Sequence, residues 1–402
     1  MRVCMVAYTF YERDNRVMRY AETLAKRGDQ VDVLSLYLKG LHGPGLRNGV
    51  RVLHVQERTV DEKNQFAYLI RVSLFFLRAM IHVSINHIRK PYQLVHVHSV
   101  PDFLVFTAWL PRLMGAKIIL DIHDLLPEFY GSKFHCSKDS PIFKLMLWVE
   151  KVSCAFAYYV ILPNHIWLER IRSRSVPASK STVVLNYPDP SIFYPRGRSR
   201  HDDRFRMIYP GTLGMHQGLD IAIRALAKVK DMIPQAYFHI YGTGEAMENL
   251  VKLAKELGIG DRVQFHPFMP IWEIAQVMEN ADLGVVPKRN DSFGNEAFST
   301  KTLEFMALGV PLLISDTAVD RYYFNDRIVT FACSGDVNDF GAKMVQLVRD
   351  PEARHKQVEN AGEFIELNNW DVKKSEYLNL VDVLTGMAVP VPAKPGQDSV
   401  IP

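Results

Sequence analysis

The chain has 402 residues, and because a domain usually comprises about 100–200 residues, we expect two domains. Hydrophobic residues make up 48% and charged residues 23%, proportions that are typical of a globular protein and exclude a collagen-like or disordered chain. The formal net charge of +4 is too small for a nucleic-acid-binding surface, so we expect no nucleic-acid partner.

The first half of the chain alternates short apolar runs with amphipathic stretches. The runs predict strands at Val3–Tyr8, Val31–Leu36, Val50–Val55, Leu94–His98, Lys117–Asp121, Tyr158–Leu162 and Thr182–Leu185. Such alternation predicts a parallel sheet covered by helices on both faces, which we assign to a first domain at residues 1–190. The polar, basic stretch from Pro195 to Arg204 is typical of a linker.

The most hydrophobic stretch lies between Phe66 and Ile88. Charged and polar residues interrupt it, whereas a membrane span needs about 20 predominantly apolar residues, so we expect that it does not cross a membrane. On a helix, one stripe beside a wide apolar face would carry the basic residues Arg71, Arg78, His82 and Arg89. Residues 66–90 are therefore either a basic amphipathic helix in peripheral contact with an anionic membrane, or a sheet-covering helix with one charged edge.

A second alternating series predicts another doubly wound domain at residues 205–369. Its predicted strands are Arg206–Tyr209, Tyr237–Tyr241, Arg262–Phe265, Leu283–Val286, Pro311–Ser315 and Ile328–Phe331. In such α/β sheets, ligands bind beyond the carboxyl ends of the strands, so two facing domains would form a binding cleft. The proline-rich tail at residues 389–402 predicts disorder.

The segment from Asn295 to Pro311 connects two strands of the second series. Ser299 or Thr300 can cap the start of a helix there, and Gly309 with Pro311 can end it. This placement leaves Glu296 in the loop before the helix and Glu304 in one of its early turns. Both carboxylates can then face one ligand.

A sugar nucleotide would suit these residues, because its hydroxyls need acceptors and its diphosphate needs donors and positive charge. Glu304 can accept from ribose hydroxyls and Glu296 from hydroxyls of the sugar. Donors for the diphosphate would be the Lys301 ammonium and the backbone N–H groups of Ala297, Phe298 and Ser299 at the start of the helix.

The Glu-x7-Glu pattern is followed by Ala307-Leu308-Gly309-Val310-Pro311. In this strand and helix context, the pattern resembles glycosyltransferase family 4, whose members have the GT-B fold. The resemblance covers nearly the whole chain, because further motifs of the family match Leu24, Gly28 and Val31, the segments Ile208–Leu213, Gln217–Asp220 and Ile240–Gly244, and Trp370.

The resemblance implies two Rossmann-like domains that face each other across a cleft. Residues 1–190 would bind the acceptor and residues 205–369 the donor, and a closing helix at residues 370–388 would return to the N-terminal domain. It further implies a nucleotide-diphosphate sugar as donor substrate, retention of the anomeric configuration, and no requirement for a metal or other cofactor.

One departure from the family concerns the glycine-rich loop after the first strand of the second domain. The family commonly has an arginine and a lysine there, whereas this chain has Thr212 and Gln217. Positive charge must therefore come from elsewhere, first from Lys301. The resulting donor-binding candidates are Glu304, Ala297, Phe298, Ser299, Thr300, Gly211, Thr212, Gln217, Gly242, and, as reserve cations, Lys288 and Arg289.

The candidate catalytic residues are Glu296, Lys301 and His123. His123 lies just past the strand Lys117–Asp121 and resembles the family's histidine that contacts the donor sugar. A histidine satisfied by a turn, or a metal ligand together with Asp121 and Asp124, is the alternative, although the sequence shows no compact ligand set. We therefore predict no metal site.

Asn15 and Arg16, in the loop and helix after the first strand, are candidates for acceptor contact. His96 and His98 alternate on one strand and point the same way, which could suggest a metal pair. A partly buried strand face explains them more simply.

The sequence thus predicts a retaining glycosyltransferase of polysaccharide or glycoconjugate biosynthesis, with a glycan or lipid-linked glycan as acceptor. A GT-B nucleotide-sugar epimerase and a non-catalytic nucleotide-sugar-binding protein are the alternatives. A nicotinamide-dependent oxidoreductase would need glycines after the first strand, and Val6–Phe10 has none. Four scattered cysteines and no visible export signal favour a cytoplasmic protein, with the inner face of the membrane as a further location.

Overall fold

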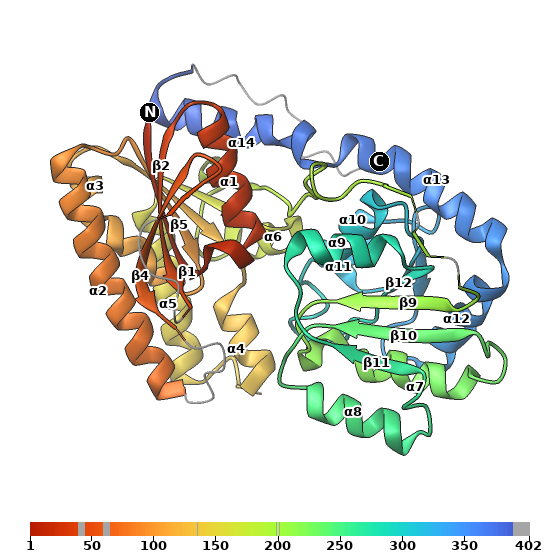
Figure 1. Ribbon diagram of the computed structural model, residues 1–402. Helices are drawn as coiled ribbons and strands as arrows, with labels where there is room; N and C mark the ends of the chain where they lie inside the picture. The colour runs from red at the N-terminus through yellow and green to blue at the C-terminus, as the bar shows by residue number, and fades with distance from the viewer. Residues whose placement is uncertain (39–44, 59–64, 135, 198, 201, 389–402) are drawn as a thin grey trace. The chain divides into compact units, whose positions relative to one another are not determined.

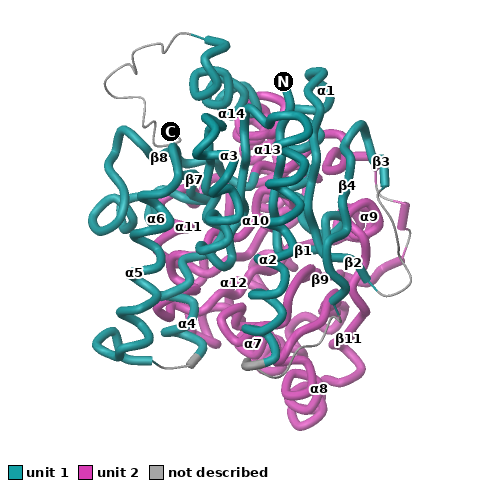
Figure 2. The backbone as a smooth tube through the Cα atoms, turned by 90° about the vertical axis from the view of Figure 1, so that its left-hand side faces the viewer, with its two compact units in different colours: residues 1–186, 374–393 teal, residues 187–373, 394–402 magenta. Residues whose placement is uncertain are grey.

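The computed structural model describes residues 1–38, 45–58, 65–134, 136–197, 199–200 and 202–388, so the predicted tail at 389–402 lies outside the described residues. The chain forms two compact units (Figure 2). Unit 1 comprises Met1–Asn186 and the chain from Lys374 to the end of the last helix, and unit 2 comprises Tyr187–Lys373.

Unit 1 is built on an eight-stranded sheet with the order β3-β4-β2-β1-β5-β6-β7-β8 (Figure 1). Its strands are β1 (Arg2–Phe10), β2 (Gln30–Tyr37), β3 (Gly45–Arg47), β4 (Val50–Glu57), β5 (Leu94–Ser99), β6 (Lys117–Ile122), β7 (Tyr159–Leu162) and β8 (Ser181–Val183). Every predicted strand of this half is present. The prediction of a purely parallel sheet is wrong at one edge, because β3 pairs with β4 in the antiparallel direction.

The connections of unit 1 are mostly helical. They are η1 (Tyr11–Arg13), α1 (Asn15–Lys26), α2 (Gln65–Arg89), η2 (Asp102–Ala108), α3 (Trp109–Leu113), α4 (Leu126–Phe134), α5 (Pro141–Phe156), α6 (His165–Arg172) and η3 (Ala178–Lys180). The α1 helix starts at Asp14, whose side chain accepts from the N–H of Val17. The α2 helix buries Val72, Phe75 and Ala79 against the unit, as a sheet-covering helix must.

Unit 2 contains a six-stranded parallel sheet with the order β11-β10-β9-β12-β13-β14. Its strands are β9 (Phe205–Pro210), β10 (Ala236–Tyr241), β11 (Val263–His266), β12 (Leu283–Val286), β13 (Leu312–Ser315) and β14 (Thr330–Ala332). The strand order changes direction between β9 and β12. In such a sheet, the ligand-binding crevice lies beyond the carboxyl ends of these two strands. The strands here are short, buried and apolar, as expected for a parallel sheet covered on both faces.

The connections of unit 2 are η4 (Met215–Gln217), α7 (Leu219–Val229), α8 (Met247–Glu256), α9 (Ile271–Glu279), α10 (Thr300–Ala307), α11 (Ala318–Tyr323), α12 (Val337–Arg349) and α13 (Pro351–Leu367). The last helix, α14 (Trp370–Thr385), begins in unit 2 and continues into unit 1. Within unit 1, Asp382 forms an ion pair with Arg27 at 2.6 Å, and the ring of Tyr377 packs on that of Tyr20 with centroids 4.3 Å apart.

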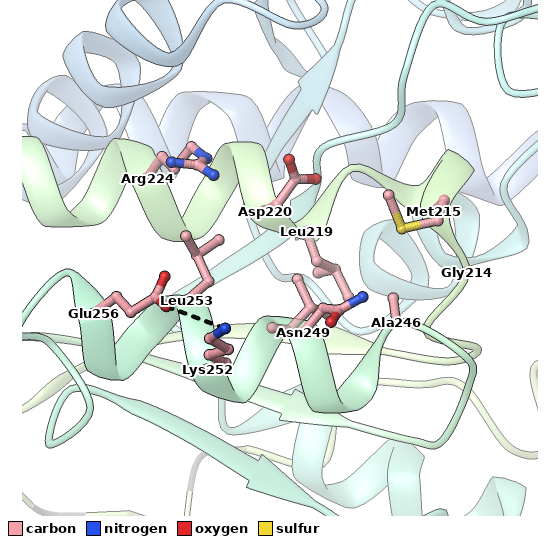
Figure 3. A pocket seen from close by; sticks show the side chains of 11 residues that line it. Gly214, Met215, Leu219, Asp220, Arg224, Ala246, Asn249, Lys252, Leu253 and Glu256 are labelled. Atoms are coloured by element: carbon pink, nitrogen blue, oxygen red, sulfur yellow. Dashed lines mark ion pairs between the residues drawn. The ribbon is translucent and has the colours of Figure 1, made fainter.

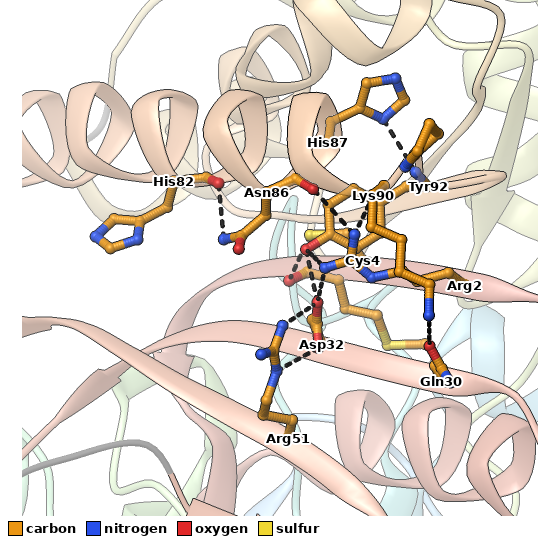
Figure 4. A network of polar contacts seen from close by, with 12 residues as sticks. Arg2, Cys4, Gln30, Asp32, Arg51, His82, Asn86, His87, Lys90 and Tyr92 are labelled. Atoms are coloured by element: carbon orange, nitrogen blue, oxygen red, sulfur yellow. Dashed lines mark hydrogen bonds and ion pairs between the residues drawn. The ribbon is translucent and has the colours of Figure 1, made fainter.

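A buried polar network ties the first strands of unit 1 to the end of α2 (Figure 4). The Asp32 carboxylate accepts from Arg2 at 2.9 Å, from the Tyr92 hydroxyl at 2.6 Å, and from Arg51 through two bonds of 2.7 Å. Arg2 also donates to the carbonyl of Asn86, near the end of α2. Burial opposes the charge of Asp32, but the bonds from Arg51 and Tyr92 outweigh it and lower the pKa of this carboxyl group.

We expect Asp32→Asn to lower the free energy of unfolding of unit 1 by about 2–3 kcal/mol at pH 7, because Arg2 would lose its buried counter-charge while Arg51 is partly solvated. The lowered pKa makes this contribution fully present above the ordinary pKa of an aspartate and lost as the pH falls below it. Chemical denaturation at several pH values measures the effect. Asp139→Asn, at a fully exposed site, is the control, and equal losses in both variants would contradict the prediction.

Candidate functional site

The loops after β9 and β10 touch each other through their backbones at the carboxyl edge of the unit 2 sheet. The N–H of Gly211 donates to the carbonyl of Tyr241 at 2.8 Å, and Leu213 donates to Thr243 at 3.0 Å. Gly242 has φ of 139°, and a Cβ atom on it would lie 1.9 Å from the carbonyl oxygen of Gly211. Only glycine permits this approach.

Lys301, in the first turn of α10, lies against the same glycine loop. A Cβ atom on Gly211 would come within 2.5 Å of Lys301 Cε and 3.1 Å of its Nζ. The ammonium lies 5.1 Å from the centre of the Tyr209 ring. Burial lowers the pKa of Lys301 to about 8, although the charge of Glu304 acts in the opposite direction. The structure therefore brings together Gly211, Gly242 and Lys301.

The start of α10 differs in one respect from the prediction. The N–H of Ala297 was expected to be free for a ligand, but it donates to the carbonyl of Phe293 at 2.9 Å. This happens because residues 292–296 form a turn before the helix. For Phe298 and Ser299, no such bond from the N–H groups exists within the described part of the chain. Ser299 occupies the N-cap position as expected, without a side-chain cap bond.

Buried hydroxyls strengthen the polar character of this helix start. The Oγ of Ser299 and the Oγ1 of Thr302 are buried without a hydrogen-bond partner among the described residues. Buried hydroxyls are normally paired, so an unpaired one marks a place for a ligand or a water molecule. Ser299 therefore extends the donor set formed by the N–H groups and Lys301.

The two reserve cations are held by partners within unit 2, and their contact with a ligand stays a prediction. Lys288 is buried, and its ammonium donates to the Ala297 carbonyl at 2.8 Å and pairs with Asp320 at 2.8 Å. Arg289 pairs with Asp220 at 2.5 Å and donates to the carbonyl of Met215 at 3.1 Å. Both are already committed to partners of unit 2.

The remaining predicted residues surround the helix start. Glu296 lies in the turn before α10, where its N–H donates to Phe293, and Glu304 lies half-buried in the helix. Thr212 is exposed in the loop after β9, and its carbonyl accepts from the Tyr209 hydroxyl at 2.9 Å. Gln217 donates to or accepts from His216 at 2.9 Å, which holds it in η4. The other two are Thr300, half-buried at the first position of α10, and Phe298, whose ring packs on Tyr323 and Phe324.

A separate surface pocket of about 290 Å³ lies between α7 and α8 (Figure 3). Its walls include Asp220 and Arg224 from α7 and the ion-paired Lys252 and Glu256 from α8. None of the predicted donor-binding residues lines it. The pocket is a groove between two helices, beside the loops that carry the candidate site.

In unit 1, His123 belongs to a buried network around Asp121. Arg16 donates to both carboxylate oxygens of Asp121, at 2.6 and 2.7 Å. Nδ1 of His98 and Nε2 of His123 lie 3.0 and 3.1 Å from the same carboxylate. Burial alone would lower the pKa of His123, but the Asp121 charge outweighs it and raises that pKa, whereas burial lowers the pKa of His98.

The predicted acceptor residues are placed differently from one another. Arg16 is buried, and besides Asp121 it donates to the carbonyl of Val184 and to Asn186. Its guanidinium is thus held by partners inside unit 1, and its contact with an acceptor stays a prediction. Asn15 is half-buried at the first position of α1, and its contact with an acceptor stays a prediction.

His96 and His98 are fully rather than partly buried. One ring nitrogen of His96, one of His98 and a carboxylate oxygen of Asp121 all lie within 4.8 Å of one another, a spacing compatible with a metal ion. A metal ion there would be repelled by the Arg16 guanidinium, which already binds the Asp121 carboxylate. The Nδ1 of His96 also forms a hydrogen bond of 3.0 Å with the Tyr377 hydroxyl. The geometry favours a hydrogen-bond network over a metal centre.

Two family models cover most of the chain. The model for a glycosyl transferase 4-like domain matches residues 14–186, and the model for glycosyl transferases group 1 matches residues 194–364. The chain belongs to the family 4 glycosyltransferases. Its two parallel-sheet domains are those of the GT-B fold.

Similar proteins agree with this assignment. The D-inositol 3-phosphate glycosyltransferase of Thermomonospora curvata is 24% identical over 396 residues, which cover 92% of this chain and 89% of that protein. Sucrose-phosphate synthase from Thermosynechococcus elongatus has a TM-score of 0.79 at 18% identity, over 96% of this chain and 100% of that one. Anabaena Alr3699/HepE in complex with UDP-glucose has a TM-score of 0.72 at 14% identity, over 95% and 100% of the two chains.

Sequence reasoning did not predict the structural role of several residues that shape the site of this glycosyltransferase. Asn295 fixes the loop before α10 to the start of α11, because its side chain accepts a hydrogen bond of 2.8 Å from the N–H of Ala318. Asp320 anchors Lys288, and Asp121 orients His123. Asp121 follows a predicted strand just before His123, so its position was a usable signal. Asn295 and Asp320 carried no comparable signal.

We expect His123 to titrate above the ordinary histidine pKa of about 6.5, and His98 below it, because Asp121 favours the imidazolium of His123 while burial dominates at His98. Histidine side-chain NMR spectra over pH 5–9 measure both values in the unmodified protein. The His123→Gln variant assigns its signal. The reverse order of the two pKa values would contradict the network.

Proposed function

We propose that this glycosyltransferase uses a nucleotide-diphosphate sugar as its donor and that unit 2 binds the diphosphate at the start of α10. The observation that carries the proposal is the position of Lys301, whose ammonium lies against the backbone of Gly211 in the crevice region of the parallel sheet. A helix N-terminus and a cation together favour an anion. The HepE structure in complex with UDP-glucose supports the same class of donor.

Different groups around Lys301 bind different parts of the donor. The N–H groups of Phe298 and Ser299, with the buried Oγ of Ser299, are suited to phosphate oxygens. Glu304, one helical turn after Lys301, accepts from ribose hydroxyls, and Glu296 accepts from hydroxyls of the sugar. Since Lys288 and Arg289 are committed to the fold, Lys301 carries the main positive charge toward the leaving diphosphate.

We further propose that transfer proceeds with retention of the anomeric configuration. The leaving diphosphate accepts the proton of the attacking acceptor hydroxyl on the same face of the sugar, and His123 contacts the donor sugar. Retaining glycosidases instead need a carboxylate nucleophile with a second carboxyl group about 5 Å away. Positioning and fixed positive charge, rather than a covalent intermediate, then supply most of the rate enhancement.

The proposed acceptor is a hydroxyl of a glycan or lipid-linked glycan, in polysaccharide or glycoconjugate biosynthesis. Lys301 and the helix start supply the charge that a metal ion would provide, so the proposal includes no metal cofactor. It places the enzyme in the cytoplasm, at the inner face of the membrane, with α2 as the contacting element. The outward face of that helix supports this location.

Release of nucleoside diphosphate from a panel of nucleotide sugars and glycan acceptors tests the function. We expect Lys301→Ala to lower kcat/KM for the donor by about 10²–10³-fold, as loss of a transition-state donor does. Glu304→Ala should cost about 10–100-fold, through loss of charge-assisted hydrogen bonds. Lys252→Ala and Glu256→Ala, which change the same residue types in the α7–α8 pocket, are the matched controls.

Three other outcomes would count against the assignment. Unchanged kinetics in both the Lys301 and Glu304 variants would refute the donor site. Conversion of the donor without any acceptor would indicate an epimerase. A product of inverted configuration, seen by NMR of the anomeric proton, would refute retention.

The pH dependence of donor binding offers a further prediction. Because burial lowers the pKa of Lys301 to about 8, a nucleoside diphosphate should bind roughly tenfold more weakly at pH 9 than at pH 7. Calorimetry measures the affinity at both pH values. In Lys301→Arg, whose guanidinium stays charged, the loss should be much smaller. An equal loss in both proteins would show that another group titrates.

A further inference from the structure

The α2 helix has two apolar faces, of which only one packs against the protein. The inner face carries Val72, Phe75, Ala79 and Val83, all buried. The opposite face carries aliphatic residues that are each 43–65% exposed, namely Ile70, Leu74, Leu77, Ile81, Ile85 and Ile88. At 100° per residue these six side chains fall within about 80° of arc. They form a stripe about 27 Å long.

The exposed apolar surface continues onto neighbouring helices of unit 1. The α2 helix contacts η2 and α3, and η2 contacts α5. Figure 2 shows α2, α3 and α5 side by side on one face of the unit. The large exposed side chains there are Trp109 and Leu113 of α3, Met114 directly after it, and Ile142, Leu145 and Trp148 of α5. We call the surface formed by these six residues and the α2 stripe the three-helix face.

The exposed charged side chains of α2, α3 and α5 are all basic. Arg71, Arg78, His82 and Arg89 form a second stripe of α2, within about 40° of arc and directly beside the aliphatic one. Lys144 and Lys151 are exposed on α5, and Lys144 lies 3.9 Å from the exposed Asp139 just before that helix. The three helices contain a single acidic residue, Glu150, which is buried and paired with Arg174 at 2.5 Å. Exposed apolar residues beside cations suit an anionic lipid surface.

We propose that the three-helix face is a docking surface for an anionic bilayer, with α2 lying parallel to the membrane. Tryptophans such as Trp109 and Trp148 are favoured at the depth of lipid headgroups. A second copy of the chain would bring two basic stripes together, whereas anionic headgroups neutralise them. Single exposed apolar side chains are ordinary, whereas a set gathered on neighbouring helices marks an interaction surface.

The same geometry distinguishes docking from insertion. Within the described residues, Ala67–Arg89 is the one helical segment long and apolar enough to cross a membrane by length and composition, with a mean hydropathy of 1.5. Its inner face is occupied by the sheet of unit 1, so crossing would expose that core. The helix therefore lies on the bilayer. This surface specifies the membrane contact of the proposed function but does not depend on the donor chemistry.

Co-sedimentation of the full chain with phosphatidylglycerol/phosphatidylcholine vesicles tests the surface without measuring transfer. We expect binding that rises with the phosphatidylglycerol fraction and weakens with salt. Leu77→Glu with Ile81→Glu should lower the affinity at least tenfold. Arg78→Gln and Arg89→Gln should each lower it about fivefold, the loss for one cation near an anionic surface. Met232→Glu with Trp272→Glu, at half-exposed apolar sites of unit 2, is the matched control.

The outcomes separate this inference from the proposed function. Equal binding by the Leu77/Ile81 variant, the control and the unmodified protein would overturn the docking surface, even if nucleotide release proceeds normally. A dimer in light scattering that the Leu77/Ile81 variant dissociates, without any change in vesicle binding, would also overturn it and indicate a second copy as the occupant. We expect each variant to fold, because the substituted side chains face solvent. Circular dichroism checks this.

Discussion

The buried ion pair between Lys288 and Asp320 determines the form of the candidate donor site. Lys288 also donates to the Ala297 carbonyl, so one ammonium ties the loop after β12, the segment before α10 and the helix α11 together. Removing either charge would leave the other buried and unpaired, which proteins tolerate poorly. Because this pair holds the loop, Glu296, Ser299 and Lys301 can occupy fixed positions at the start of α10. It also holds the Lys288 ammonium within the fold.

The fold was predictable to a large extent, because buried parallel strands can be recognised in a sequence as short apolar runs. Every predicted strand exists, with ends displaced by a few residues. The antiparallel edge strand β3 was missed because three residues cannot show a periodic pattern. The Glu-x7-Glu segment was placed correctly, with Ser299 at the N-cap of α10. Side-chain partners were harder to predict, since Lys288 and Arg289 find theirs through loops distant in sequence.

Arg16 illustrates the same difficulty in unit 1. Its position after the first strand suggested a ligand contact, but an arginine beside a buried aspartate is held by that charge instead. The network it forms with Asp121 gives His123 a defined orientation, because both contacts of this histidine use Nε2. The α2 helix shows the converse case. Its apolar face appeared wide enough to be buried, yet the structure divides it into an inner half that packs and an outer half that does not.

Together these features support the proposal of a glycosyltransferase in which fixed charge and backbone geometry, rather than acid–base pairs, bind the donor. A crystal structure of the protein with a bound nucleoside diphosphate tests this claim most directly. The account predicts phosphate oxygens within hydrogen-bonding distance of Lys301 Nζ and of the N–H groups of Phe298 and Ser299, with the ribose at Glu304. A nucleotide bound instead in the α7–α8 pocket, with Lys301 out of reach of its phosphates, would contradict it.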